Sequence, residues 1–361
     1  MSTRPLSFIP GPSKISDAVY RDIETAITEG ILELSHRSDA FTTIVEQSLE
    51  NLRIYLDVPE SFAVLYTESA TNAWHSMVAN AVRERSAHIV TGAFSAKAAA
   101  VASKLGKQTK EYSVNVQSDA PDFPTTIEES AELVTICLSE SSNGSAWTEA
   151  ELAHLRSLAP QAIIGVDITS CAGAVTIDMT LADVWYFSVQ KAFGLPAGLG
   201  VLILSPTAVA RGRELASRGQ NLAGMWGWDE LVNNYQRGRG PTPYTPNMLG
   251  IYLLTKQTER LLAAGGLSTV SVATFKKAEL LYQYLEQHPV LTPYIPHLTH
   301  RSPTVICARA EPADISALHT QAISHRMRLG AGYGELKTTT LRLANFPSIT
   351  DADISALLAW L

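Results

Sequence analysis

Residues 184–205 read VWYFSVQKAFGLPAGLGVLILS, and this stretch decides the fold. It contains two short apolar runs, 184–190 and 198–205, which are rich in β-branched, aliphatic and aromatic residues. AIIGVDI at 162–168 is a third run of the same kind. Near-continuous apolar strands are typical of mainly parallel sheets that helices cover on both faces. Ligands bind beyond the carboxyl ends of such strands, so we look for function there.

Similar segments alternate along the first part of the chain. Apolar runs occupy 62–68, 88–92 and 133–140, and helix-like stretches occupy 71–84, 95–106 and 148–159. The last of these helices begins with Thr148 and Glu151 at the spacing of a capping box. The alternation predicts an α/β large domain built from βαβ units.

The last third of the chain has a different pattern. Two long helices, expected at 248–266 and 270–288, are separated by a Gly-Gly break. Strands are expected at 304–310 and 339–346, and helices at 313–327 and 351–361. This order predicts a small α+β domain with a small antiparallel sheet. We place the large domain at 15–255, and the small domain at 1–14 together with 256–361.

Composition narrows the class of protein. The chain has 361 residues, a net charge of −7, 46% hydrophobic residues and 17% charged residues, which is a globular composition. The acidic balance argues against nucleic-acid binding, and no apolar run approaches the roughly 20 residues that span a membrane. Three widely spaced cysteines show no metal-binding pattern. We therefore expect a cytoplasmic protein with no metal site, no membrane contact and no nucleic-acid partner.

Asp167 and Lys191 each follow an apolar strand, and 24 positions separate them. This spacing fits one strand, one crossover and the next strand, so both side chains would face one crevice. A carboxylate for a pyridinium nitrogen and a lysine for an aldehyde are the two protein partners of pyridoxal phosphate. Taken singly, the aspartate is equally well explained as a helix cap, and the lysine as a surface residue at a strand end.

Two other strand ends carry small polar residues. Ser69, Ala70 and Thr71 open a helix, where backbone N–H groups and the helix dipole favour an anion. The alternative is an ordinary N-cap. Ser141 follows the strand run at 133–140, and its hydroxyl either meets a ligand or completes a turn.

Taken together, these features resemble the class V aminotransferases of fold type I, and most specifically the phosphoserine aminotransferase branch. The resemblance covers nearly the whole chain. The segments that carry it are FIPGPSKIS (8–16), LSHRSDAF (34–41), GVDITSCAGAV (165–175), WYFSVQKAFGLPAGLGVLIL (185–204) and TTLRLANFPSI (339–349). It implies a seven-stranded, mainly parallel sheet covered by helices, a small C-terminal α+β domain, and pyridoxal 5′-phosphate as cofactor.

The resemblance also implies roles for residues around the cofactor ring. Lys191 would bind the cofactor covalently and then act as the catalytic base. Asp167 would pair with the pyridine nitrogen, Ser141 would meet the ring hydroxyl, and Gln190 would line the site beside the lysine. Phe94 stands where the family usually has a tryptophan that stacks on the ring.

The cofactor phosphate would be bound by the segment Ser69, Ala70 and Thr71. Thr71 stands where the family usually has an arginine, so positive charge would have to come from the helix and elsewhere. Tyr244 and Thr245 match the loop with which a neighbouring subunit reaches the phosphate. This match implies a homodimer with shared active sites. Arg237 and Arg239, just before that loop, either help neutralise the phosphate or are solvated.

The substrate residues implied by the resemblance are His36, Arg37 and Arg342. Arg342 would bind the substrate α-carboxylate with its fork of donors. His36 and Arg37 match the pair with which an adjacent subunit binds a substrate phosphate. Many members have a second His-Arg pair shortly before the carboxylate arginine. Residues 330–337 read GAGYGELK and contain neither residue type, so Tyr333 or Lys337 would have to substitute.

The expected activity is reversible amino transfer between O-phospho-L-serine and 2-oxoglutarate by a ping-pong mechanism in serine biosynthesis, with small amino and 2-oxo acids as partners. The GYG-x-LK pattern keeps an alternative open, an alanine/serine–glyoxylate or serine–pyruvate aminotransferase. A remoter alternative is a pyridoxal-phosphate-binding protein without activity. A cysteine desulfurase would need a mobile cysteine late in the chain, whereas Cys307 lies in a strand-like run.

Overall fold

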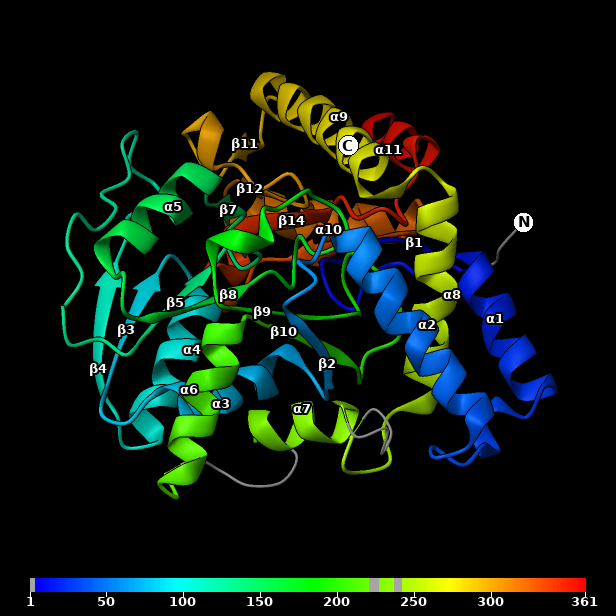
Figure 1. Cartoon of the computed structure of the whole chain (residues 1–361). Helices are drawn as coiled ribbons and strands as arrows, with labels where there is room; N and C mark the ends of the chain where they lie inside the picture. Colours follow the sequence, from blue (N-terminus) through cyan, green and yellow to red (C-terminus); the bar gives the residue numbers. More distant parts are fainter. Residues whose placement is uncertain (1–3, 221–226, 237–241) are drawn as a thin grey trace.

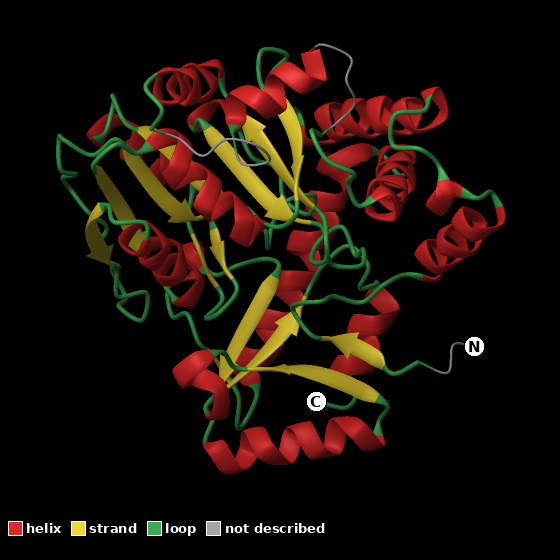
Figure 2. Ribbon diagram, turned by 90° about the horizontal axis from the view of Figure 1, so that it is seen from below, coloured by secondary structure: helices red, strands yellow, loops and turns green. Residues whose placement is uncertain are grey.

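The computed structural model describes residues 4–220, 227–236 and 242–361 (Figure 1). Its strands form two main sheets, which appear as separate groups of strands in Figure 2. A two-stranded ribbon, β6 (Ser139–Glu140) with β7 (Ser145–Ala146), lies beside them. Within the described ranges, no helix is both long and apolar enough to cross a membrane.

The larger sheet has seven strands and is mainly parallel, which confirms the predicted fold class. Only β10 runs antiparallel to its neighbours, β2 and β9. In spatial order the strands are β2 (Ala63–Thr67), β10 (Gly200–Leu204), β9 (Val184–Ser188), β8 (Ile163–Asp167), β5 (Leu133–Cys137), β3 (Arg85–Val90) and β4 (Gln108–Ser113). Strands β8 and β9 are adjacent and parallel, so their carboxyl ends meet at one edge.

Helices cover both faces of this sheet because its central strands are apolar on both sides. In β9, Trp185 and Phe187 belong to one hydrophobic core, while Val184 and Tyr186 belong to the other. One face carries α1 (Asp17–Thr28), α2 (Asp39–Leu56), α5 (Glu149–Leu158) and α8 (Met248–Ala263). The other carries α3 (Ala70–Ala81), α4 (Ala93–Lys104), α6 (Pro206–Ser217) and α7 (Trp228–Gln236) (Figure 1). The capping box predicted at Thr148 is confirmed.

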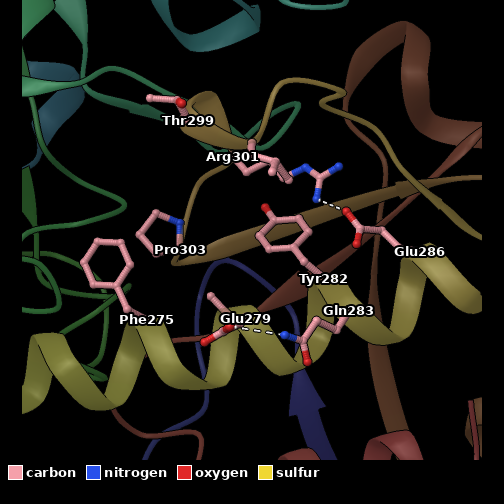
Figure 3. A pocket seen from close by; sticks show the side chains of 10 residues that line it. Phe275, Glu279, Tyr282, Gln283, Glu286, Thr299, Arg301 and Pro303 are labelled. Atoms are coloured by element: carbon pink, nitrogen blue, oxygen red, sulfur yellow. Dashed lines mark hydrogen bonds and ion pairs between the residues drawn. The ribbon is translucent and has the colours of Figure 1, made fainter.

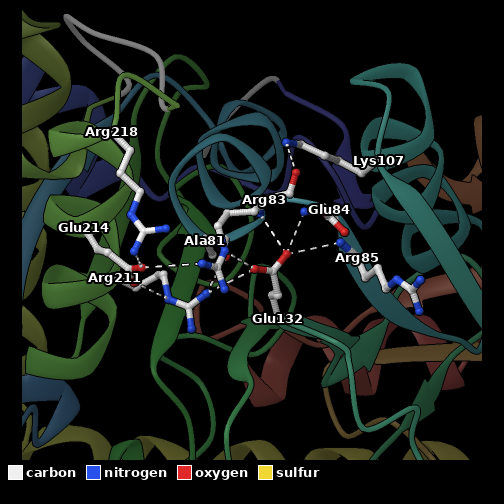
Figure 4. Close-up of polar contacts among 9 residues, drawn as sticks. All are labelled: Ala81, Arg83, Glu84, Arg85, Lys107, Glu132, Arg211, Glu214 and Arg218. Atoms are coloured by element: carbon white, nitrogen blue, oxygen red, sulfur yellow. Dashed lines mark hydrogen bonds and ion pairs between the residues drawn. The ribbon is translucent and has the colours of Figure 1, made fainter.

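Glu132 bridges two strands at the amino end of β5, the end of the sheet opposite Asp167. Its polar contacts are shown in Figure 4. It directly precedes β5, and its carboxylate accepts hydrogen bonds from the backbone N–H groups of residues 83–85, which lead into β3. The Arg83 guanidinium adds a bond of 2.8 Å. Burial would raise the pKa of Glu132, but these donors outweigh it and lower that pKa. This bridge holds β3 and β5 in register.

The smaller sheet has five strands and is mixed. Its order is β1 (Leu6–Phe8), β13 (Met327–Ala331), β14 (Thr340–Ala344), β12 (Val305–Arg309) and β11 (Thr292–Pro293). It packs with α9 (Gly266–Gln287), α10 (Pro312–Ser324) and α11 (Asp351–Leu358), and short 3₁₀ turns lie at Ile31–Glu33, Met179–Leu181, Leu298–His300 (η4) and Gly334–Thr338 (η5).

Two expectations for this sheet were wrong. The sheet is not wholly antiparallel, because β1 pairs parallel with β13. The helix expected to reach residue 327 ends at Ser324, since Arg326 has a left-handed φ of 56° and β13 begins at Met327. The domain boundaries at residues 14 and 255 stay a prediction.

The segment after β1 connects the smaller sheet with the predicted lysine. Ser13 donates two hydrogen bonds, from its N–H to the Gln190 carbonyl at 2.9 Å and from its hydroxyl to the Lys191 carbonyl at 2.6 Å. A Cβ atom at Gly11 would lie 3.3 Å from Lys191 Cε. The chain near residue 11 therefore passes directly against the lysine side chain.

Candidate active site

Asp167 and Lys191 line one pocket at the carboxyl ends of β8 and β9, as their spacing predicts. Asp167 is the last residue of β8, and Lys191 follows the end of β9 by three positions. The pocket is lined by Ala70, Thr71, Trp74, Phe94, Cys137, Ser141, Asp167, Thr169, Ser170, Ser188, Gln190 and Lys191. Seven of these twelve were predicted from the sequence.

The Lys191 ammonium points into this pocket and is held by hydroxyl groups. Its Nζ atom donates to Ser141 Oγ at 2.7 Å and lies 3.4 Å from Ser170 Oγ. Burial lowers the pKa of Lys191, while the carboxylate of Asp167 acts in the opposite direction. A lowered pKa raises the fraction of neutral amine, which is the form that attacks an aldehyde.

The Asp167 carboxylate is buried, with 7% of the residue exposed. It accepts a hydrogen bond of 2.8 Å from the Thr169 N–H. Burial raises the pKa of Asp167, and the bonds from Thr169 and the charge of Lys191 reduce that effect. A buried carboxylate that faces a pocket is stabilised by a cationic ligand atom, such as a protonated ring nitrogen.

Phe94 brings an aromatic ring over the lysine. Its ring centre lies 5.1 Å from Lys191 Nζ. Phe94 is in the first turn of α4, and its N–H points to the fully buried carboxylate of Glu140 at 3.2 Å. Glu140 also accepts from Ser95 N at 3.0 Å and from Ser142 Oγ at 2.6 Å.

Sequence reasoning missed this role of Glu140. The available signal was a charged residue at the end of the apolar run 133–140. A carboxylate so deeply buried needs donors, and the N-terminus of α4 supplies them. Glu140 therefore holds Phe94 and the neighbouring Ser141 in fixed relative positions.

The N-terminus of α3 has an open donor toward the pocket. Ser69 caps the helix through Asn72 N, and Ala70 N donates to Ser188 Oγ at 2.8 Å. The N–H of Thr71 makes no hydrogen bond within the described chain, and Thr71 lines the pocket. The helix start is therefore suited to an anionic group. The side-chain oxygen of Gln190 is also buried in the pocket wall without a partner in the described ranges.

Arg342 lies on β14 and reaches the same place from the smaller sheet. Its Nε donates to the Ala331 carbonyl at 2.7 Å and its Nη1 to the Ser141 carbonyl at 2.9 Å. Ser141 therefore contacts both Arg342 and Lys191. The guanidinium is partly buried, and this burial lowers the pKa of Arg342 without making it neutral.

The four residues predicted to act across a subunit interface do not line this pocket. They are His36, Arg37, Tyr244 and Thr245. His36 Nδ1 lies 3.3 Å from Thr245 Oγ1, so the two predicted cross-subunit segments meet on one surface. Arg237 and Arg239 lie outside the described residues.

Two other features of the described ranges lack this chemistry. Lys277 is buried, but its ammonium donates to the Phe346 and Ile349 carbonyls at 3.3 and 2.5 Å. It does not line the pocket around Lys191. A groove between α9 and η4 is lined by apolar side chains and by polar ones most of which are paired (Figure 3). There, Tyr282 donates to the Ser302 carbonyl at 2.8 Å, and Arg301 pairs with Glu286 at 2.6 Å.

Comparison with known proteins identifies the family. Residues 8–332 match the family model described as aminotransferase class-V. The chain belongs to the class-V aminotransferase family. This match covers most of the chain, including all seven strands of the larger sheet, so the enzyme is a pyridoxal-phosphate-dependent aminotransferase.

Relatives of this aminotransferase include proteins named phosphoserine aminotransferase. One from Nocardioides sp. is 26% identical over 353 residues, which cover 97% of this chain and 92% of the relative. A solved phosphoserine aminotransferase from Cytophaga hutchinsonii is 30% identical and superposes with a TM-score of 0.93. The superposition covers 99% of this chain and 98% of the other. An alanine–glyoxylate aminotransferase from Nostoc sp. shares the fold at 20% identity, a TM-score of 0.81 and coverage of 99% and 94%.

The pocket of this aminotransferase fits pyridoxal phosphate on its own chemistry. The open N–H of Thr71 at a helix start suits the phosphate, and the buried Asp167 suits the ring nitrogen. Phe94 offers a ring face beside the Lys191 amine. The unpartnered oxygen of Gln190 leaves an acceptor for a bound group.

Proposed function

We propose that this aminotransferase moves an amino group reversibly between O-phospho-L-serine and 2-oxoglutarate, giving 3-phosphohydroxypyruvate and L-glutamate. One observation carries the proposal. Ser141 accepts from Arg342 through its carbonyl and from Lys191 through its hydroxyl, so a carboxylate-binding arginine stands beside the reactive amine. The names of the relatives support phosphoserine as the amino acid.

Each residue then has a defined task. Pyridoxal phosphate, when bound, supplies an aldehyde that accepts the amino group and a ring that withdraws electrons from the substrate Cα. Arg342 binds the substrate α-carboxylate through its guanidinium. The Lys191 amine removes the proton from the substrate Cα, a role for which its lowered pKa suits it. Asp167 keeps a proton on the ring nitrogen through its buried negative charge.

The remaining cofactor contacts follow from position. Ser69, Ala70 and Thr71 at the start of α3 bind the phosphate, the Ser141 hydroxyl meets the ring hydroxyl, and Phe94 stacks on the ring. Gln190 binds beside Lys191. These assignments are proposals that the geometry of the pocket supports.

We also propose that the enzyme is a homodimer. The pocket around Lys191 is not lined by four residues of its own chain that the resemblance assigns to the site, namely His36, Arg37, Tyr244 and Thr245. Of these, His36 contacts Thr245. In a twofold dimer this surface would complete the partner's site, with His36 and Arg37 binding the substrate phosphate and Tyr244 and Thr245 the cofactor phosphate. We further propose that the enzyme acts in serine biosynthesis in the cytoplasm.

A second candidate is transfer from alanine or serine to glyoxylate or pyruvate. Residues 330–337 favour it, because they contain no histidine or arginine to bind a substrate phosphate. Its chemistry at Lys191 and Arg342 would be the same, and only the side-chain site would differ.

The test is a titration of the purified holoenzyme with O-phospho-L-serine, L-glutamate, L-alanine and L-serine, followed by the visible absorption band of the bound cofactor. We expect phosphoserine and glutamate to bleach the band at low concentration. Bleaching by alanine or serine, with no response to phosphoserine, would replace the proposed substrate by the second candidate.

A further inference from the structure

Two aromatic rings beside the pocket contact three side chains that can carry positive charge. The Phe94 and Tyr333 ring centres are 4.9 Å apart. Phe94 lies 5.1 Å from Lys191 Nζ, and Tyr333 lies 5.5 Å from the Arg342 guanidinium carbon. The third cation is Lys97, whose Nζ lies 5.6 Å from the Phe94 ring centre and 4.8 Å from that of Tyr333.

Lys97 is one helical turn after Phe94 on α4, so the same helix carries the ring and the ammonium. Its ammonium donates a hydrogen bond to the Tyr333 hydroxyl. This contact joins α4 of the larger sheet to the loop before η5 of the smaller one. Within the described ranges, Lys97, Lys191 and Arg342 form no salt bridge.

Lys97 and Arg342 therefore both lie beside the Tyr333 ring without a carboxylate in contact with either of them in the described ranges. Glu140 is fully buried and directs its oxygens to the backbone at the start of α4, not to Lys97. Lys191 is reserved for the cofactor, so Lys97 and Arg342 are the two cations here that form no salt bridge within the described ranges. A pair of such cations favours a ligand with two negative groups. A ligand with a single carboxylate would satisfy only Arg342.

Lys337 is the cationic residue of the segment 330–337, which contains no histidine or arginine. It is exposed in η5, and it contacts none of Phe94, Tyr333 or Arg342 through a ring or hydrogen bond. Lys97 has both kinds of contact. These contacts favour Lys97 of α4 over Lys337 of η5 as the additional cation that acts beside Arg342.

We propose that Lys97 binds the second anionic group of the substrate, a side-chain phosphate or carboxylate, with the Tyr333 hydroxyl orienting the ammonium. This inference rests on the proposed function and extends it, because it defines the substrates as amino acids and 2-oxo acids that carry two negative groups. Arg342 binds the α-carboxylate, and Lys97 discriminates by the distal charge.

The test compares Lys97→Met, Lys97→Arg and Tyr333→Phe holoenzymes with the wild type. The half-saturating concentrations of O-phospho-L-serine, L-glutamate and L-alanine are measured from the cofactor band. For Lys97→Met we expect an increase of about tenfold for the first two and little change for alanine, since one charge-assisted hydrogen bond is lost. Lys97→Arg keeps the preference, and Tyr333→Phe weakens it in part.

A binding measurement adds a readout that needs no turnover. Glutarate and butyrate differ only in the distal carboxylate, and neither carries an amino or oxo group. Calorimetry on the wild-type holoenzyme should give tighter binding of glutarate, and Lys97→Met should abolish that difference. Lys110→Met is the matched control, because Lys110 also lies over a tyrosine ring, that of Tyr112, but on the edge strand β4 away from the pocket.

The outcomes separate this inference from the function on which it rests. If the wild type takes phosphoserine and glutamate but Lys97→Met weakens alanine equally, or weakens nothing, the role of Lys97 is wrong and the function stands. The same holds if Lys337→Met produces the selective loss instead. If the wild type responds only to alanine or serine, both the proposed substrate and the role of Lys97 are wrong.

Discussion

Lys191 and Ser141 are joined by a hydrogen bond of 2.7 Å from Nζ to Oγ, although 50 positions separate them in the chain. The bond connects the turn after β9 with the turn between β6 and β7, and β9 belongs to a different sheet from β6 and β7. The carbonyl of Ser141 is also the acceptor for Arg342. One serine therefore sets the distance between the amine that would do the chemistry and the guanidinium that would bind the substrate.

Replacing the lysine tests the central assignment. Lys191→Ala removes the amine and its bond to Ser141 but leaves the sheet unchanged, so we expect transamination to fall at least about 10³-fold with the thermal unfolding temperature nearly retained. Steady-state assays and circular dichroism check this. Normal turnover in this variant would remove Lys191 from the mechanism.

Arg37 tests the shared site. Arg37→Ala should weaken O-phospho-L-serine far more than L-glutamate, because it would remove a phosphate ligand, and half-saturating concentrations measure the difference. Arg21→Ala, an exposed arginine on α1, is the control. Equal losses for both substrates would make Arg37 structural.

Mixed dimers test the same interface without new substitutions. Lys191→Ala chains and Arg37→Ala chains, unfolded together and refolded in equal amounts, would form some dimers with one intact site. The assay uses a phosphoserine concentration too low for the Arg37→Ala enzyme to turn over. About a quarter of the wild-type phosphoserine activity should return if each site uses residues of both subunits. No recovery would place Lys191 and Arg37 in one subunit's site.

The fold was predictable because its signals are local. The apolar runs that predicted β8, β9 and β10 are also the strands buried on both faces of the sheet. By contrast, β4 reads QTKEYS, and it forms a strand only because it pairs along β3 at the sheet edge. No local apolar pattern marks such a strand.

Site residues could be predicted from the sequence only where the order of the strands in the sheet brings them together. Asp167 and Lys191 follow neighbouring parallel strands, so their meeting follows from topology. The contact between Lys97 and Tyr333 spans 236 positions and depends on how the smaller sheet packs against α4. Glu140 likewise acquires its role only through the distant start of α4. The sequence marks Glu140 as unusual, but neither its partner nor the partner of Lys97 can be predicted from residue spacing.

His88 gives the protein a pH-dependent stability. It is fully buried in β3 between Ser86 Oγ at 2.9 Å and Thr135 Oγ1 at 2.6 Å, and burial lowers its pKa from 6.5 to about 4. The unfolded chain thus binds the proton more readily, so stability falls as pH drops from 6.5 toward 4. Between pH 7 and 5 we expect a loss of about 2 kcal/mol from this residue.

Thermal melts at several pH values check this contribution. His88→Asn keeps polar contacts but removes the titration, so its unfolding free energy should change less between pH 7 and 5. His154→Asn, on the exposed side of α5, should behave like the wild type. If both variants keep the full wild-type pH dependence, another group is responsible.

Glu132 makes a second contribution to stability that is lost in acid. Glu132→Gln would weaken the bonds from residues 83–85 and Arg83, at a cost of about 1 to 3 kcal/mol near pH 7. Because the pKa of Glu132 is lowered below 4.5, its contribution is present above that pH and is lost as pH falls through the lower folded value. The variant and the wild type should therefore converge in acid.

Urea unfolding at pH 7 and below pH 4.5 measures that convergence. Glu128→Gln is the matched control, since its carboxylate pairs with Arg85 at 3.0 Å on the surface, where 41% of each side chain is exposed. We expect that change to cost less than about 1 kcal/mol. Equal costs for the two variants would mean that Glu132 does not bridge the two strands.

The segment from Phe8 to Ser13 couples the two sheets mechanically. One end is a strand of the five-stranded sheet, and the other is bonded to the carbonyl groups of Gln190 and Lys191. A shift of the smaller sheet is therefore passed to the backbone that carries the reactive amine. A variant that lacks residues 1–13 would therefore be inactive, although none of the removed residues lines the pocket.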